Sequence, residues 1–292
     1  MTYRFLAACA TIQRDPAHLR LRDRAVLRIL NRAGAATAAQ LTTLAYRNRR
    51  LAQAHLRRLW ADGLLERASL PPAGSRGGSP LAYRLSPACL HRLGYGRNPW
   101  RGPGYLAHTL DGVEVVAALV RSGEREPQPP VQLWLPESIV GDLAPDGTAP
   151  DALVVIATET GAGVVSLEID EATQHVAPIR DKIDGYRRAL DGRAGWHVLF
   201  VVPTAARQAW LRRLAARLDL GLARFWTVTS GDLGESGLDA VVAGIGPGAP
   251  ILTLRGALDD TKQRWSQTPV GTAAWLELLG SGGGEEPSKL LL

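Results

Sequence analysis

The chain has 292 residues, enough for two modest domains, and its 46% content of apolar residues is typical of a globular protein. Residues 1–101 carry 18 Arg and no Lys against four acidic residues, a net charge of +14, whereas residues 102–292 carry 16 basic and 24 acidic residues, a net charge of −8. Two cysteines without a Cys/His cluster argue against a disulfide scaffold and against a structural zinc site. The sequence has neither an 18-residue apolar run nor a secretory signal, which predicts a cytoplasmic protein without a membrane partner.

The basic first part predicts a polyanionic partner. A general preference for Arg in the source proteome is an alternative reason for the Arg content. That preference does not explain why acidic residues are rare in one part of the chain only.

Three helices are predicted in the first part. Apolar residues recur at helical spacing over Val26–Ala33, and Gly34 ends this helix. Thr37 is a suitable N-cap for a second, short helix. A third helix follows after a tight connection and extends over about residues 49–62.

A β-hairpin is predicted next, with strands at 64–70 and 81–85 and a tip rich in Pro and Gly around Arg76. Three helices followed by a hairpin is the order of a winged helix-turn-helix, in which the third helix enters the major groove of DNA and the hairpin contacts the backbone. The alternative is a protein-interaction domain with a solvated basic helix.

Side chains suited to DNA line one face of the third helix, where Arg49, Gln53 and Arg57 follow at intervals of four residues. Arg reaches guanine edges or phosphates, and Gln pairs with adenine. The sequence therefore predicts double-stranded DNA as a partner. The predicted DNA-binding residues are Arg47, Arg49, Arg50, Gln53, Arg57, Arg58 and Arg76.

A linker rich in Gly and Pro over 94–104 separates this domain from a second one. The second domain is expected to contain a mixed sheet with helices packed on it. The predicted elements are a helix at 105–120, strands at 131–135, 152–157 and 163–170, a helix at 175–190, a strand at 196–202, a helix at 205–218 and a strand at 224–228. The predicted domains are 1–101, 102–255 and a C-terminal extension, 256–292, with disordered last residues.

Three carboxylates are candidate metal ligands. Asp151 opens one predicted strand, and Glu168 and Asp170 lie two residues apart on the next, so that their side chains share a face. Clustered carboxylates repel one another unless a cation neutralises them, and their oxygens suit Mg²⁺ or Mn²⁺. The alternative is a group of strand-end acids that face solvent.

These residues carry a family resemblance. Pro150-Asp151, the run Ser166–Asp170, the run Lys182–Tyr186 and the stretch around His108 resemble the replication-relaxation family of plasmid and mobile-element proteins, over about residues 20–230. The resemblance implies an α+β protein with an N-terminal winged helix and an α/β domain similar to restriction endonucleases, of the PD-(D/E)XK nuclease type. It also implies that Asp151 and Glu168 match the acids of the nuclease motif, with Glu114 as an additional acid.

One position departs from the pattern, because Asp170 stands where an active nuclease of this type has Lys. Lys182, on the following helix, is a candidate replacement that would complete a catalytic set with Asp151 and Glu168. The alternative is that Lys182 forms only an ion pair at the helix surface. His108 is a further candidate for the acidic cluster, and a core or rim residue is its alternative.

Two functions follow from this reading. The first is a DNA-binding protein of a plasmid or mobile element that acts in replication or relaxation or in its regulation, with a nuclease-like domain that has become inactive. The second is a metal-dependent DNA endonuclease or nickase that uses Mg²⁺ or Mn²⁺ at the Asp151/Glu168 cluster. A replication or relaxase protein and a second copy of the chain are the other expected partners.

Overall fold

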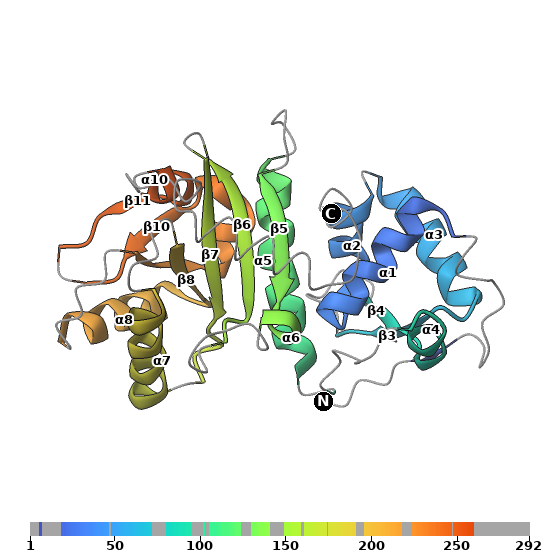
Figure 1. Ribbon diagram of the computed structural model, residues 1–292, viewed down its shortest axis with the longest axis horizontal. Coiled ribbons are helices and arrows are strands. Elements are labelled where there is room, and N and C mark those ends of the chain that lie inside the picture. The colour runs from blue at the N-terminus through green and yellow to red at the C-terminus, as the bar shows by residue number, and fades with distance from the viewer. Residues whose placement is uncertain are drawn as a thin grey trace. The chain divides into compact units, whose positions relative to one another are not determined.

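The computed structural model forms two compact units that divide between Ala117 and Ala118, inside helix α5 (Leu106–Ser122). Arg47, Arg76, most of the predicted linker and the chain from residue 260 onward lie outside the described residues. The structure describes residues 6–7, 19–46, 48–71, 80–94, 102, 105–123, 130–140, 149–158, 161–173, 175–190, 196–217, 224–246 and 248–259 (Figure 1).

The first unit combines helices with a small antiparallel sheet whose strand order is β1-β3-β4-β2. The three predicted helices and the predicted hairpin are present in the expected order. Its elements before α5 are β1 (Leu6–Ala7), α1 (Leu21–Ala33), β2 (Ala36–Thr37), α2 (Ala38–Ala45), α3 (Arg49–Ala61), β3 (Leu65–Ser69), β4 (Leu81–Leu85) and α4 (Pro87–Arg92).

Local chemistry fixes the ends of these helices. Helix α1 ends at Gly34, whose φ of 84° is open to glycine, and the Gly34 N–H donates to the Leu30 carbonyl. Helix α2 begins with a capping box between Thr37 and Gln40. Helix α3 is capped by Asn48, whose side chain accepts a hydrogen bond from the Leu51 N–H.

The second unit contains the C-terminal end of α5 and a seven-stranded sheet with the order β11-β10-β9-β8-β7-β6-β5. Strands β7, β8 and β9 are parallel and the other neighbours are antiparallel, so the sheet is mixed, as predicted. Its further elements are β5 (Val131–Pro136), α6 (Glu137–Val140), β6 (Ala152–Thr158), β7 (Gly161–Ile169), α7 (Val176–Ala189), β8 (Trp196–Val202), α8 (Ala205–Arg217), β9 (Phe225–Thr229), α9 (Ser230–Ser236), the 3-10 helix η4 (Gly237–Asp239), β10 (Val241–Gly244), β11 (Ile251–Thr253) and α10 (Leu254–Asp259).

Helices α7 and α8 pack together on one face of this sheet. Their apolar residues, which include Ile183 and Leu211, share a core with Val198 and Phe200 of β8. The register places Glu168 of β7 opposite Phe200, and residues paired across neighbouring strands project to the same face. The side chain of Glu168 therefore faces α7 and α8.

The α+β class, the mixed sheet and the antiparallel hairpin of β3 and β4 agree with the sequence prediction. The short helices α4, α6, α9, η4 and α10 and the strands β1, β2, β10 and β11 were not predicted. Within the described part of the chain, every helix is too short or too polar to cross a bilayer.

Candidate functional site

Asp151 is held beside Glu168 at one end of strands β6 and β7. Its backbone N–H donates to the Leu167 carbonyl at 3.0 Å, and its Oδ2 accepts from the Ile169 N–H at 2.6 Å. Ala152 pairs with Leu167, so the antiparallel register continues with Asp151 opposite Glu168. The strands thus bring together the two acids that the sequence predicted as neighbours.

Glu168 is a buried carboxylate with only 2% of its surface exposed. Lys182 Nζ donates to its Oε2, and the Tyr186 hydroxyl donates to its Oε1. Lys182 and Tyr186 lie four residues apart on α7, which places both on one face of the helix. Helix α7 therefore holds both oxygens of this carboxylate.

The charges of this group depend on one another. Burial raises the pKa of Glu168 to about 7, Lys182 opposes this rise, and Asp151 adds to it. Burial also favours a lower pKa for Lys182, but Glu168 and Asp151 outweigh this effect and raise its pKa. The neighbouring carboxylates therefore keep Lys182 protonated at neutral pH.

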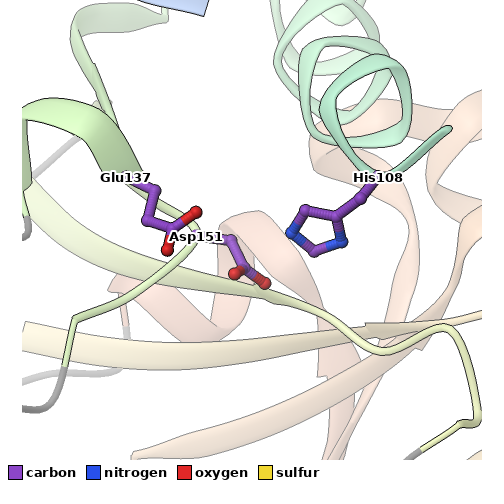
Figure 2. Close-up of side chains that lie close together, drawn as sticks. All are labelled: His108, Glu137 and Asp151. Atoms are coloured by element: carbon purple, nitrogen blue, oxygen red, sulfur yellow. The ribbon is translucent and has the colours of Figure 1, made fainter. Parts of the chain in front are cut away.

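A third carboxylate, Glu137, was not predicted from the sequence. It begins the four-residue helix α6 directly after β5, and its N–H donates to the Asp151 carbonyl at 2.8 Å. Figure 2 shows the Glu137 and Asp151 side chains together, and their candidate ligand oxygens lie within 4.8 Å of each other. The signal available in the sequence was the position of Glu137 two residues after the strand predicted at 131–135.

Asp170, the third predicted metal ligand, is bound elsewhere. Arg207 of α8 donates to Oδ2 through Nε at 2.6 Å and to Oδ1 through a terminal nitrogen at 3.2 Å. The Ala172 N–H also donates to Oδ1 at 2.9 Å. The carboxylate is thus neutralised by Arg207, and the structure gives it a different set of partners from those of Glu168.

The two candidates on α5 lie in its N-terminal part, within the first unit. The ring of His108, which is also labelled in Figure 2, makes an edge contact with Tyr105, with ring centroids 6.5 Å apart. Glu114 accepts a hydrogen bond from the Gln40 side chain at 3.1 Å. Glu114 thereby links α5 to α2.

The predicted DNA-binding residues of α3 fall into two groups. The side chains of Arg49, Arg50, Gln53 and Arg57 are exposed. Arg58 instead donates to both oxygens of Asp23 on α1, at 2.9 and 2.7 Å. Asp23 is fully buried, so Arg58 neutralises a charge inside the first unit.

Comparisons with known proteins identify one family. No curated protein and no solved structure matches the chain. The family model described as replication-relaxation matches residues 27–199, which include α2, α3, Asp151, Glu168 and Lys182. Because this match covers more than half of the sequence, the protein belongs to the replication-relaxation family.

Proposed function

We propose that this protein binds double-stranded DNA and acts in the replication or relaxation of a plasmid or mobile element. The observation that carries the proposal is the exposed face of α3 with Arg49, Arg50, Gln53 and Arg57. Three helices followed by a hairpin are the order of a winged helix, and α3 is the helix that such a domain inserts into the major groove. A replication or relaxase protein is the partner class that the family suggests.

The electrostatics of the first unit support this proposal. The four α3 side chains that carry the proposal are exposed, so they can approach phosphates without first leaving the protein core. Each phosphate that Arg neutralises releases counterions, which makes the affinity fall as the salt concentration rises. The excess of basic residues over 1–101 adds a long-range attraction for the same polyanion.

The test is a double variant, Arg49→Ala/Arg57→Ala, in a fluorescence anisotropy titration with labelled duplex DNA at several salt concentrations. We expect weaker binding and a salt dependence that is smaller by about two phosphate contacts. The matched control is Arg213→Ala/Arg217→Ala, which removes two exposed Arg from α8. Equal losses in both double variants would mean that α3 is not the binding element.

A second function, metal-dependent cleavage of DNA, is favoured by a specific observation. Lys182 lies against Glu168, which in turn lies beside Asp151, so two acids and a lysine occupy one place although Asp170 replaces the lysine of the motif. Arg207 neutralises Asp170 and removes the charge conflict that this replacement would create. The supported activity is that of a DNA endonuclease or nickase.

The donor set fits a hard divalent cation. Carboxylate oxygens are the ligands that Mg²⁺ and Mn²⁺ prefer, and Asp151 and Glu137 present theirs within 4.8 Å of each other, with Glu168 as the adjacent acid. Such a cation, when bound, polarises a phosphate and lowers the pKa of water. The charge of Lys182 would offset negative charge that develops on the phosphate.

The activity is tested by incubating supercoiled plasmid with the protein in Mg²⁺ or Mn²⁺ and separating nicked and linear products. We expect cleavage by the wild type and its loss in Asp151→Asn and Lys182→Met. Asp181→Asn is the control, because this exposed acid precedes Lys182 and is paired only with Arg180 among the described residues. An intact plasmid with the wild type in both cations would reduce the second unit to a scaffold.

A further inference from the structure

We infer that Tyr186 is a positioning residue, which uses its hydroxyl to hold Glu168 against Lys182 and beside Asp151. The inference rests on the second proposed function, because it assigns a role at the same cluster. Tyr186 belongs to the sequence run that carries the family resemblance. Its position on the apolar face of α7 accounts for an aromatic ring there, but not for the hydroxyl group. The contacts of the hydroxyl carry the additional role.

The hydroxyl belongs to a chain of hydrogen bonds with one direction. The Tyr186 hydroxyl donates to Glu168 Oε1 and so uses the single proton of the phenol in this hydrogen bond. A further side-chain hydrogen bond links Tyr186 to Ser166, so Ser166 must donate to the Tyr186 oxygen. Ser166 Oγ in turn accepts from Trp196 Nε1 at 3.0 Å.

The two ends of this chain fix its direction. An indole N–H only donates, and Glu168 only accepts at a pH above its pKa of about 7, where it is ionised. Every donor between Trp196 and Glu168 therefore points toward the carboxylate. Burial raises the pKa of Tyr186 well above its usual value, which keeps the hydroxyl protonated as a donor and makes it unsuitable as a nucleophile.

The geometry gives this hydroxyl control over the orientation of Glu168. With Tyr186 at Oε1 and Lys182 at Oε2, the carboxylate plane is fixed from both sides by one helix. Without the hydroxyl, Glu168 would keep only the flexible Lys182 side chain as a partner on α7. The position of the Lys182 amine relative to Asp151 would then be less defined.

The ring of Tyr186 is separable from the hydroxyl. The ring packs edge-on against Phe225 at a centroid distance of 6.3 Å, within the apolar core of α7 and α8. Tyr186→Phe keeps this packing and removes only the hydrogen bonds. Ser166→Ala removes the preceding donor and leaves the Tyr186 hydroxyl in place.

The first measurement does not depend on activity. The chain has three lysines, Lys182, Lys262 and Lys289, so the rate at which an amine-reactive reagent labels each can be followed by mass spectrometry. We expect Lys182 to be labelled severalfold faster in Tyr186→Phe than in the wild type, and less so in Ser166→Ala. Lys262 and Lys289 serve as internal references.

The second measurement is plasmid cleavage in Mn²⁺ and the affinity for Mn²⁺ alone. Loss of a residue that orients a metal-site group costs about tenfold or more in affinity or activity, so we expect kcat to fall by this factor while KM for DNA is unchanged. The control is Tyr46→Phe, which removes a buried hydroxyl without a hydrogen-bond partner among the described residues.

The outcomes separate this inference from the function on which it rests. Unchanged Lys182 labelling in Tyr186→Phe, with unchanged kcat and Mn²⁺ affinity, would overturn the positioning role. Faster Lys182 labelling in Tyr186→Phe, together with a wild type that neither cleaves DNA nor binds Mn²⁺, would overturn the nuclease function and leave the positioning of Lys182 supported. Faster labelling together with a lower kcat supports both.

Discussion

Arg57 and Arg58 are adjacent in the sequence and share one chemistry, but the fold gives them different surroundings. Successive residues of a helix point about 100° apart, so Arg57 projects into solvent while Arg58 reaches Asp23 on α1. His55, one turn earlier on α3, has its Nδ1 3.4 Å from the same carboxylate. Burial lowers the pKa of His55, so Arg58 supplies the positive charge that Asp23 requires.

Removal of Arg58 is therefore expected to destabilise the first unit. Arg58→Ala leaves the fully buried Asp23 without its cation, and breaking a buried pair from one side costs about 3 kcal/mol. Arg57→Ala is the matched control, because its exposed side chain predicts a change below about 0.5 kcal/mol. Urea denaturation followed by circular dichroism measures both, and similar values for the two variants would contradict the structural role of Arg58.

The longer helices and strands could be predicted from the sequence because their apolar residues repeat over more than one helical turn or strand alternation. The apolar stripe of α1 ends at Gly34, and the capping residue Thr37 marks the start of α2. The alternation along β7 correctly placed Glu168 on a strand face, and the register with β6 then fixed Asp151 beside it. The apolar stripe, the cap and the alternation are local signals, and the fold agrees with them.

The short elements could not be predicted in this way. Helix α6 has four residues, too few to display a helical period, and its position depends on the backbone hydrogen bond from Glu137 to Asp151. The strands β10 and β11 have four and three residues, and they form because β10 pairs with β9 and β11 pairs with β10. Glu137 was therefore hidden at the sequence level, although it lies next to Asp151.

The roles of Asp170 and Lys182 illustrate a second limit. The sequence identified Lys182 as a candidate partner of the acids, but its distance from Glu168 depends on how α7 packs on the sheet. The ion pair between Asp170 and Arg207 joins residues 37 positions apart, and no local pattern announces it. Long-range pairs of this kind follow from the packing of α8 on the sheet face.

For the whole molecule, the sequence divides the charge between a basic first part and an acidic remainder. The fold adds a buried histidine to the sheet of the second unit, and the pKa of this histidine is lowered strongly. His197 of β8 is 1% exposed, and its Nδ1 accepts a hydrogen bond from Trp226 Nε1 at 3.1 Å. A protonated Nδ1 could not accept this bond, so the fold requires the neutral imidazole.

This requirement predicts how the stability of the protein changes with pH. Burial, assisted by the charge of Arg224, lowers the pKa of His197 from 6.5 to about 4. Between these values the unfolded chain binds the proton and the folded chain does not. The contribution of His197 to stability is therefore fully present above pH 6.5 and is lost as the pH falls through 4. Glu168 acts in the opposite direction, because burial raises its pKa from 4.5 to about 7. Its contribution to stability is fully present below pH 4.5 and is lost as the pH rises through 7.

The contribution of His197 is isolated by comparing the wild type with His197→Asn, whose side-chain oxygen can still accept from Trp226. Both proteins retain Glu168, so its effect cancels in the difference. Between pH 7 and pH 5 we expect the free energy of unfolding of the wild type to fall by about 2 kcal/mol relative to that of the variant. Urea denaturation at the two pH values gives this difference. Parallel pH dependences would mean that His197 is protonated in the folded protein, which would require its Nδ1 to give up the Trp226 hydrogen bond.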